Sequence, residues 1–253
     1  MKKSVFIYFL SLLLGMFLSE IIFKCINDSS LFSIDMIRIF MGLGVLSGVL
    51  AFIFNFFKEG IAKFLVVLAN FLVSLYASIQ LGFDNFIGVY ISFQTSSQLG
   101  AVKDYITDFV RSFEPIFFLP FLSFGIVLIS LIVFRKKLSG ERVKGKATIR
   151  FILPTVALCL SCYMATIIMP ALQDKTLPVG TKELFLTASN PSLTVEQFGT
   201  TGFCLLDVKA MLFPVTIEEE YKVSSPKQQE KNPNSRIIDD TKWLSVIEEE
   251  ENK

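Results

Sequence analysis

The sequence predicts an all-α fold: a polytopic membrane bundle of about five transmembrane helices, with interfacial amphipathic helices and a disordered extracellular tail. Apolar residues make up 52% of the 253 residues, and 27 are Phe. Charged residues reach only 19%, below the roughly 25% that is usual in soluble domains. A bilayer core needs about 20 apolar residues in a helix. Five runs reach that length: Val5–Phe23, Ile39–Phe57, Phe64–Phe83, Ile116–Phe134 and Phe151–Met169.

The first apolar run is predicted to be a retained helix. It follows Lys2 and Lys3, as a signal peptide would, but it is longer than a usual signal core and no small-residue cleavage site follows it. Glu20 lies within about one turn of its outer end. We therefore interpret Glu20 as a boundary residue that reaches the interface, and we expect no buried ionisable residues in the helices.

The basic residues predict the orientation of the chain. Eleven of them fall in alternate segments on one side: Lys2, Lys3, Lys58, Lys63, Arg135, Lys136, Lys137, Arg142, Lys144, Lys146 and Arg150. The loops on the other side hold four: Lys24, Arg38, Lys103 and Arg111. By the positive-inside rule the N-terminus is cytoplasmic, and five crossings of the plasma membrane place the C-terminus outside.

Two small-residue features concern helix packing. Gly44 and Gly48 have the G-x-x-x-G spacing that lets two helices approach closely. We favour packing within the chain over a dimer interface.

Cys159 and Cys162 form a C-x-x-C pair inside an apolar run, where cysteine behaves as a small hydrophobic residue. Packing is therefore favoured over zinc or redox chemistry.

The loop between the third and fourth runs contains a predicted amphipathic helix over Leu99–Phe113. Its apolar residues share one helical stripe: Val102, Ile106, Phe109, Val110 and Phe113. Such a helix lies at the membrane surface. It either covers the end of the bundle or shapes a pocket for a lipid headgroup.

The chain divides by composition into three parts. Residues 1–170 form the five-helix transmembrane domain, and residues 171–213 form an extracellular juxtamembrane segment. Within the latter, Phe203–Phe213 is too short to span and predicts a second interfacial helix. Residues 214–253 are highly charged and predict a linker or tail that buries no core.

No catalytic, cofactor-binding or metal-binding residue is predicted in this chain. It has no His, which removes the commonest general base and metal ligand. We find no phosphate-binding loop, nucleophile elbow, carboxylate pair or clustered metal-ligand spacing. The acidic runs Glu218–Glu220 and Glu248–Glu251 are interpreted as solvated. The net charge of +1 gives no reason to expect a nucleic-acid partner.

The segment TVEQFGTTGFCLLDV resembles the stretch just outside the last helix in the family of lipoteichoic acid synthases and phosphoglycerol transferases. The family pattern is matched or conservatively replaced at Val195, Glu196, Gly199, Phe203 and Asp207. Three positions depart from it: Gly202, Cys204 and Leu206. The segment ISFQTSSQLGAVKDYITDFVRSF is similar to the family's outer loop, so the resemblance covers most of the chain.

The resemblance implies a membrane-anchor domain without its enzyme. In that family an extracellular sulfatase-like domain, with a Thr nucleophile and a divalent metal that is usually manganese, moves glycerol phosphate from phosphatidylglycerol onto a growing polymer. This chain stops before that domain would begin, so no catalytic residue is carried over and no cofactor is expected here. We expect a truncated or separately encoded anchor for cell-envelope polymer synthesis.

The expected partners are membrane lipid, with phosphatidylglycerol as the candidate, and an extracellular catalytic domain in cis or in trans. Two other functions stay open. One is a non-enzymatic membrane scaffold or regulator. The other is a small lipid transporter.

Overall fold

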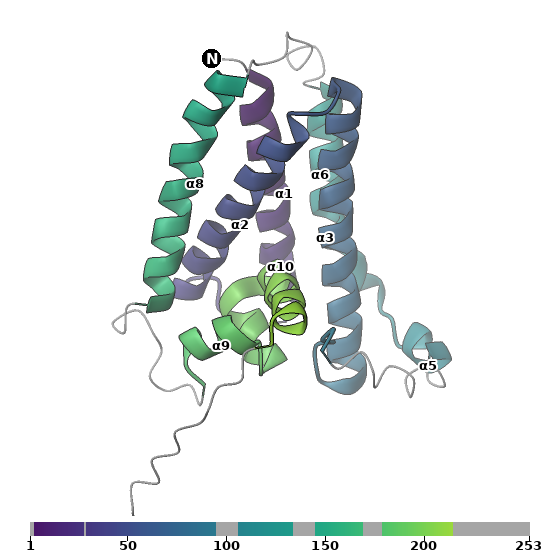
Figure 1. The fold of residues 1–253 in the computed structure, drawn as a ribbon. Coiled ribbons are helices and arrows are strands. Elements are labelled where there is room, and N and C mark those ends of the chain that lie inside the picture. The colour runs from purple at the N-terminus through teal and green to yellow at the C-terminus, as the bar shows by residue number, and fades with distance from the viewer. Residues whose placement is uncertain (1–2, 28, 95–105, 134–144, 169–178, 215–253) are drawn as a thin grey trace, which may run out of the picture. The chain divides into compact units, whose positions relative to one another are not determined.

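The described part of the chain is built from helices (Figure 1). The computed structural model describes residues 3–27, 29–94, 106–133, 145–168 and 179–214. Within these ranges every regular element is a helix. The predicted tail from residue 215 onward lies outside the described residues.

Four helical segments are long and apolar enough to cross a membrane. They are α1 (Lys3–Ile26), α2 (Ile34–Phe54), α3 (Glu59–Ile87) and the stretch Pro115–Val133, which joins the 3₁₀ turn η3 (Pro115–Phe118) to α6 (Phe121–Val133). Their apolar side chains form a shared core in which Leu12, Ile39 and Val66 are almost fully buried. The prediction of an all-α membrane bundle is confirmed.

A fifth helix, α8 (Gly145–Ile168), runs beside α2 (Figure 1). Its described apolar part, Leu153–Ile168, is shorter than the four spanning segments. The helix α8 begins before the predicted Phe151, and Pro154 lies inside it.

Gly44 and Gly48 of α2 lie against α8. A Cβ at Gly48 would stand 2.2 Å from Val156 Cγ2, and one at Gly44 would stand 2.8 Å from Cys159 Sγ. The two glycines therefore permit the close approach of α2 and α8 within one chain. Cys159 and Cys162 are both free thiols.

The outer-loop helix is described only as α5 (Ile106–Arg111). Phe109 stacks on Phe83 of α3 with ring centroids 4.5 Å apart, and Phe113 lies next to Gly82. These two aromatic residues pack on the bundle, whereas Val110 is 64% exposed. The predicted place of the stripe at the membrane surface stays a prediction. Residues 99–105 lie outside the described part.

The last two described helices, α9 (Thr181–Thr187) and α10 (Pro191–Leu212), form what we call the cap. Figure 1 shows α10 beside the ends of α1, α2 and α3, at the end of the bundle opposite the N-terminus. We call this the cap end. The helix α10 is twice the length predicted for Phe203–Phe213. It begins at Pro191, where the Asn190 side chain accepts the N–H of Leu193 at 3.1 Å.

The cap packs by its own apolar residues on two sides. Val195 and Phe203 of α10 join Phe23, Leu81 and Phe117 of the bundle. On the other side the buried cluster comprises Ile167, Leu184, Ala188, Phe198, Leu206 and Ala210. The described part of the predicted juxtamembrane segment, residues 179–213, therefore packs on the spanning helices, and the site described next lies between them.

Candidate functional site

The helix α10 is broken at Gly199, and the break creates a second helix N-terminus in the middle of the cap. Gly199 has φ 74° and ψ 171°, a conformation in which a helix cannot continue and which only glycine adopts readily. The amides of the residues that follow point back toward the break and have no helical partners. A helix N-terminus of this kind attracts an anion.

The anion that occupies this N-terminus is the carboxylate of Glu20, near the end of α1. Its Oε2 accepts the N–H of Thr200 at 2.9 Å, and its Oε1 accepts the N–H of Thr201 at 2.8 Å and the hydroxyl of Thr200 at 2.8 Å. Glu20 is fully buried. The interpretation of Glu20 as an interfacial boundary residue is wrong, because α10 covers the place where that interface was expected.

Gly199 is also in direct contact with Glu20. A Cβ on Gly199 would lie 2.8 Å from Glu20 Oε2 and 2.9 Å from its carboxyl carbon. The position thus needs glycine for two independent reasons, its backbone conformation and the approach of the carboxylate.

Two cations in spanning helices also reach the first half of α10. Lys24 Nζ donates to the carbonyl oxygen of Glu196 at 2.9 Å, and the side chain is only 3% exposed. Arg38, only 1% exposed, pairs with Asp35 at 2.7 Å and donates to Gln197 Oε1 at 3.3 Å. The prediction that the helices hold no buried ionisable residues is therefore wrong. Lys24 and Arg38, assigned to loops by the sequence pattern, belong to α1 and α2.

The second half of α10 is fastened through Asp207. Its carboxylate accepts the Ser92 hydroxyl at 2.6 Å, the N–H of Phe93, and the Gln94 side-chain amide at 3.0 Å. Asp207 is fully buried. These bonds hold the segment that follows α3 against the cap. Hydrogen bonds to a charged acceptor are stronger than hydrogen bonds between neutral groups.

The five residues of the family-like segment have separate structural roles in the cap. Val195 and Phe203 belong to the apolar core, Gly199 forms the break, and Asp207 holds the 92–94 segment. Glu196 contributes its carbonyl oxygen to Lys24 while its side chain is exposed. All five therefore lie at the junction of cap and bundle, where each stabilises the attachment.

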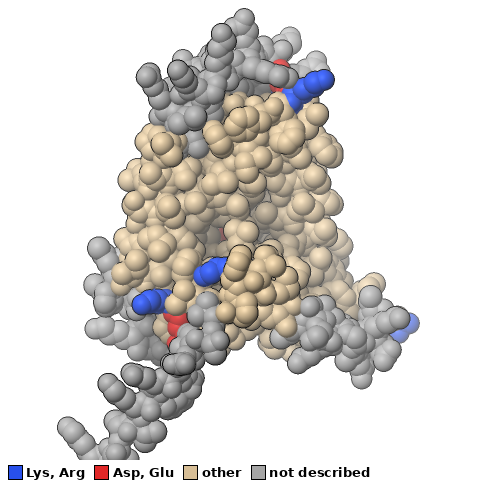
Figure 2. Space-filling model, in the orientation of Figure 1, with Lys and Arg blue, Asp and Glu red and all other residues tan. Residues whose placement is uncertain are grey.

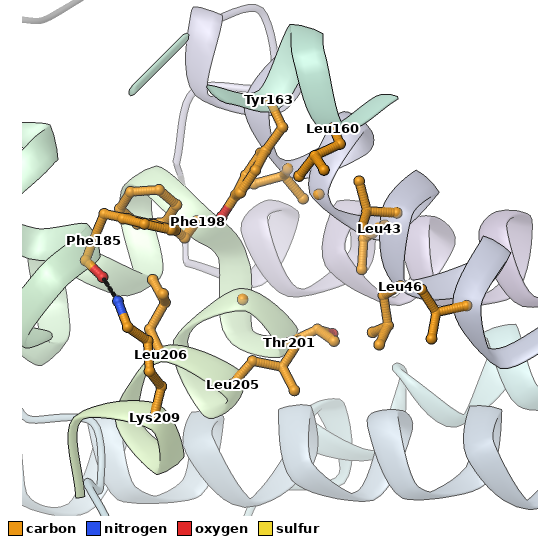
Figure 3. A pocket seen from close by; sticks show the side chains of 15 residues that line it. Leu43, Leu46, Leu160, Tyr163, Phe185, Phe198, Thr201, Leu205, Leu206 and Lys209 are labelled. Carbon is orange, nitrogen blue, oxygen red and sulfur yellow. Dashed lines mark hydrogen bonds between the residues drawn. The ribbon is translucent and has the colours of Figure 1, made fainter. Parts of the chain in front are cut away.

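An apolar cavity of about 320 Å³ lies beside this junction. Figure 3 shows its walls: Leu43 and Leu46 from α2, Leu160 and Tyr163 from α8, Phe185 from α9, and Thr201, Leu205, Leu206 and Lys209 from α10. Lys209 Nζ donates to the carbonyl oxygen of Phe185 at 3.0 Å. Burial lowers the pKa of Lys209 from its ordinary value.

A more polar cavity of about 410 Å³ lies on the other side of the junction. Its walls include Lys24, Asp84, Tyr90 and Glu196. Asn27 donates to the Tyr90 hydroxyl at 2.7 Å. Burial, and then the charge of Asp84, raise the pKa of Tyr90 above its ordinary value, so this phenol acts as a neutral hydrogen-bonding group.

The sequence reasoning missed Glu20, Lys24 and Arg38 as members of the junction. A signal was present in the sequence, because Glu20 and Lys24 stand four residues apart at the end of an apolar run and thus share a helix face. Two opposite charges on one face of a spanning helix indicate buried partners. Within the described ranges no three side chains of His, Cys, Asp or Glu gather as a metal site would require.

The fold and the junction define a multi-pass helical membrane protein whose cap is fastened to its bundle by buried charges. Comparison of the chain with protein-family models, with curated proteins and with solved structures found no match. The family resemblance of the sequence therefore remains a prediction.

Proposed function

We propose that this chain is the membrane-anchor domain of a lipoteichoic acid synthase-like phosphoglycerol transferase, which serves in the synthesis of a cell-envelope glycerol-phosphate polymer. It holds a sulfatase-like catalytic domain, in cis or in trans, at the outer face of the plasma membrane. Phosphatidylglycerol is the proposed lipid, and manganese chemistry would belong to the partner domain.

The attachment of α10 is the observation that carries this proposal. Glu20 binds the second half of α10 at its N-terminus, and Asp207 holds the same half-helix to the segment after α3. The polypeptide that leaves α10 at Phe213 therefore starts from a fixed position on the bundle. An anchor that holds an enzyme at a set distance from the bilayer needs its connecting polypeptide to start from such a fixed position.

The proposed orientation agrees with where the basic residues lie. Lys58 and Lys63 are at the junction of α2 and α3, at the end of the bundle away from the cap (Figure 1). Figure 2 shows that most of the charged described side chains on this face lie toward its two ends. Under the positive-inside rule the cap end is the outer end.

The proposal is tested by reconstituting the chain in vesicles that contain phosphatidylglycerol and manganese, with and without a sulfatase-like domain fused after Lys253. We expect no phosphoglycerol transfer by the chain alone and transfer by the fusion. Glu20→Ala in the fusion should lower the transfer rate, because the polypeptide that leaves α10 no longer starts from a fixed position on the bundle. The control Glu183→Gln, at an exposed acid, should leave the rate unchanged.

Three outcomes would contradict the proposal. Manganese-dependent turnover by the chain alone would mean that it carries its own catalytic site. Equal transfer by the fusion and by a soluble catalytic domain would favour a scaffold or regulator. Movement of labelled phosphatidylglycerol across the bilayer by the chain alone would favour a lipid transporter.

A further inference from the structure

The apolar cavity beside α10 opens along a helix that spans the membrane. Its α2 wall runs from Ile39 to Val49, a rise of about 15 Å at 1.5 Å per residue. Val49 is 43% exposed, so this end of the cavity faces the surroundings of the bundle. Those surroundings are lipid hydrocarbon where α2 spans.

The lining of the cavity is suited to a hydrocarbon chain. Leucine, isoleucine, valine and aromatic side chains form most of it (Figure 3). Cavities lined in this way do not hold water and take up apolar groups instead. Gly42 and Gly202 also line the cavity, where a Cβ would lie 3.0 Å from the Tyr163 ring and 3.0 Å from Phe198 Cβ, respectively.

Lys209 places a positive charge at the cap side of this hydrocarbon site. Its ammonium lies 4.4 Å from the centroid of the Phe185 ring and donates to the carbonyl oxygen of the same residue at 3.0 Å. That bond uses one of its three donor hydrogens. Among the described residues no carboxylate forms an ion pair with it. A half-buried ammonium without an acidic partner favours binding of an anion.

Thr201 adds a second polar group. Its side chain is 7% exposed and lines the cavity, and its hydroxyl has no hydrogen-bond partner. A hydroxyl in an apolar wall favours a ligand that brings an oxygen acceptor with it. In Figure 3 Thr201 and Lys209 project from the same helix α10, with Thr201 nearer to α2.

We infer that this cavity binds an anionic glycerophospholipid, with one acyl chain along α2 between Leu46 and Val49 and the phosphate on Lys209. A zwitterionic lipid has the same acyl chain, but its own cation competes for the phosphate, so the site selects net negative charge. This inference needs only the membrane location and does not depend on the proposed enzyme.

The binding experiment uses the full chain purified in detergent and equilibrated with mixed micelles of phosphatidylglycerol and phosphatidylcholine. Native mass spectrometry counts the retained lipid of each kind. We expect wild type to retain phosphatidylglycerol preferentially. Lys209→Gln should lower that retention about tenfold, because a hydrogen bond to a charged group is lost. Lys209→Arg should restore it, and the exposed-lysine control Lys182→Gln should match wild type.

The location of the acyl chain is tested with phosphatidylglycerol that carries a photoreactive diazirine in one chain. We expect crosslinks to peptides that contain Leu46, Val49 or Leu205. Val49→Trp should abolish them by filling the open end of the cavity. Ile129→Trp, a matched change at an exposed position of α6 outside the cavity, should not. All variants are compared at equal thermal stability in detergent.

Three results would overturn the inference. The first is equal retention of phosphatidylglycerol and phosphatidylcholine by wild type. The second is an equal effect of Lys209→Gln and Lys182→Gln. The third is crosslinks that lie elsewhere and persist in Val49→Trp, which would place the lipid outside this cavity.

Discussion

The carboxylate of Glu20 and the main chain of Thr200 meet at 2.9 Å although 180 positions separate them in the sequence. One residue belongs to the first spanning helix and the other to the helix of the cap. The contact joins the two ends of the described fold, and it is made in a fully buried setting. It is therefore the contact on which attachment of the cap depends most directly.

Removing the Glu20 side chain should destabilise the protein strongly. Glu20→Ala leaves the amides of Thr200 and Thr201 buried without an acceptor, and hydrogen bonds to a charged group are each worth about 1.5–3 kcal/mol. We expect a loss of about 3 kcal/mol or more in unfolding free energy, measured by denaturant titration in detergent. Glu183→Gln, at an exposed position, should change it by less than about 0.5 kcal/mol. Equal stability of Glu20→Ala and wild type would refute the role of this contact.

Gly199→Ala should be destabilising by a different mechanism. Its φ of 74° is unfavourable for alanine, and the new methyl group would lie 2.8 Å from Glu20 Oε2. We expect a cost of about 2 kcal/mol or more. The control is Gly125→Ala in α6, where no atom lies within 4 Å of the added Cβ. There helix propensity should leave stability unchanged or raise it by up to about 1 kcal/mol. Unchanged stability of Gly199→Ala would show that the backbone break at Gly199 is not required.

Asp207→Asn should loosen the segment after α3. The three groups that reach Asp207 are all donors, from Ser92, Phe93 and Gln94, and the asparagine amide would turn its own donor toward one of them. We expect a loss of about 1–3 kcal/mol together with faster hydrogen exchange of the Phe93 amide. Asp108→Asn, at an exposed position of α5, serves as the control. Unaltered exchange at Phe93 would mean that the carboxylate does not hold this segment.

The thiols at the cap end should react at different rates. Cys25 is exposed, whereas Cys204 is half-buried, and burial, followed by the nearby charge of Asp207, raises its pKa. Because the thiolate is the reactive form, Cys204 should be alkylated more slowly at neutral pH, and its rate should keep rising with pH above the ordinary thiol range. A membrane-impermeant maleimide should label Cys25 on intact cells if the cap end is outside.

Reporter fusions after Lys137 and after Lys253 provide an independent check of orientation, since the proposed topology places these points on opposite sides. Reporters on the same side, or Cys25 labelled only after cell lysis, would contradict that topology.

The spanning helices could be predicted from the sequence because a single comparison determines them. The length of each apolar run is compared with the thickness of the bilayer core. The run Val5–Phe23, for instance, lies within α1. Gly44 and Gly48 were recognisable for a similar reason, since their spacing is local. The helix on which they pack, α8, could not be predicted, because the G-x-x-x-G spacing is the same whichever helix is the neighbour.

The junction could not be predicted, because each of its contacts is formed between distant segments. Glu20 at the end of an apolar run looks interfacial unless α10 is known to cover it. Lys24 and Arg38 were counted as loop cations for the same reason. Gly199 could be selected by its motif, but its positive φ gives no pattern in the sequence. The local rules describe one helix at a time, whereas burial of these charges is a property of the assembled cap.

The buried carboxylate of Glu20 also has a consequence for biosynthesis. The first helix is translated before residues 200 and 201, which supply the donors to its carboxylate. Its three hydrogen bonds therefore form only after nearly the whole described chain has been translated. Docking of the cap follows translation of α10, and a chain interrupted before Thr200 lacks the groups that hold this acid.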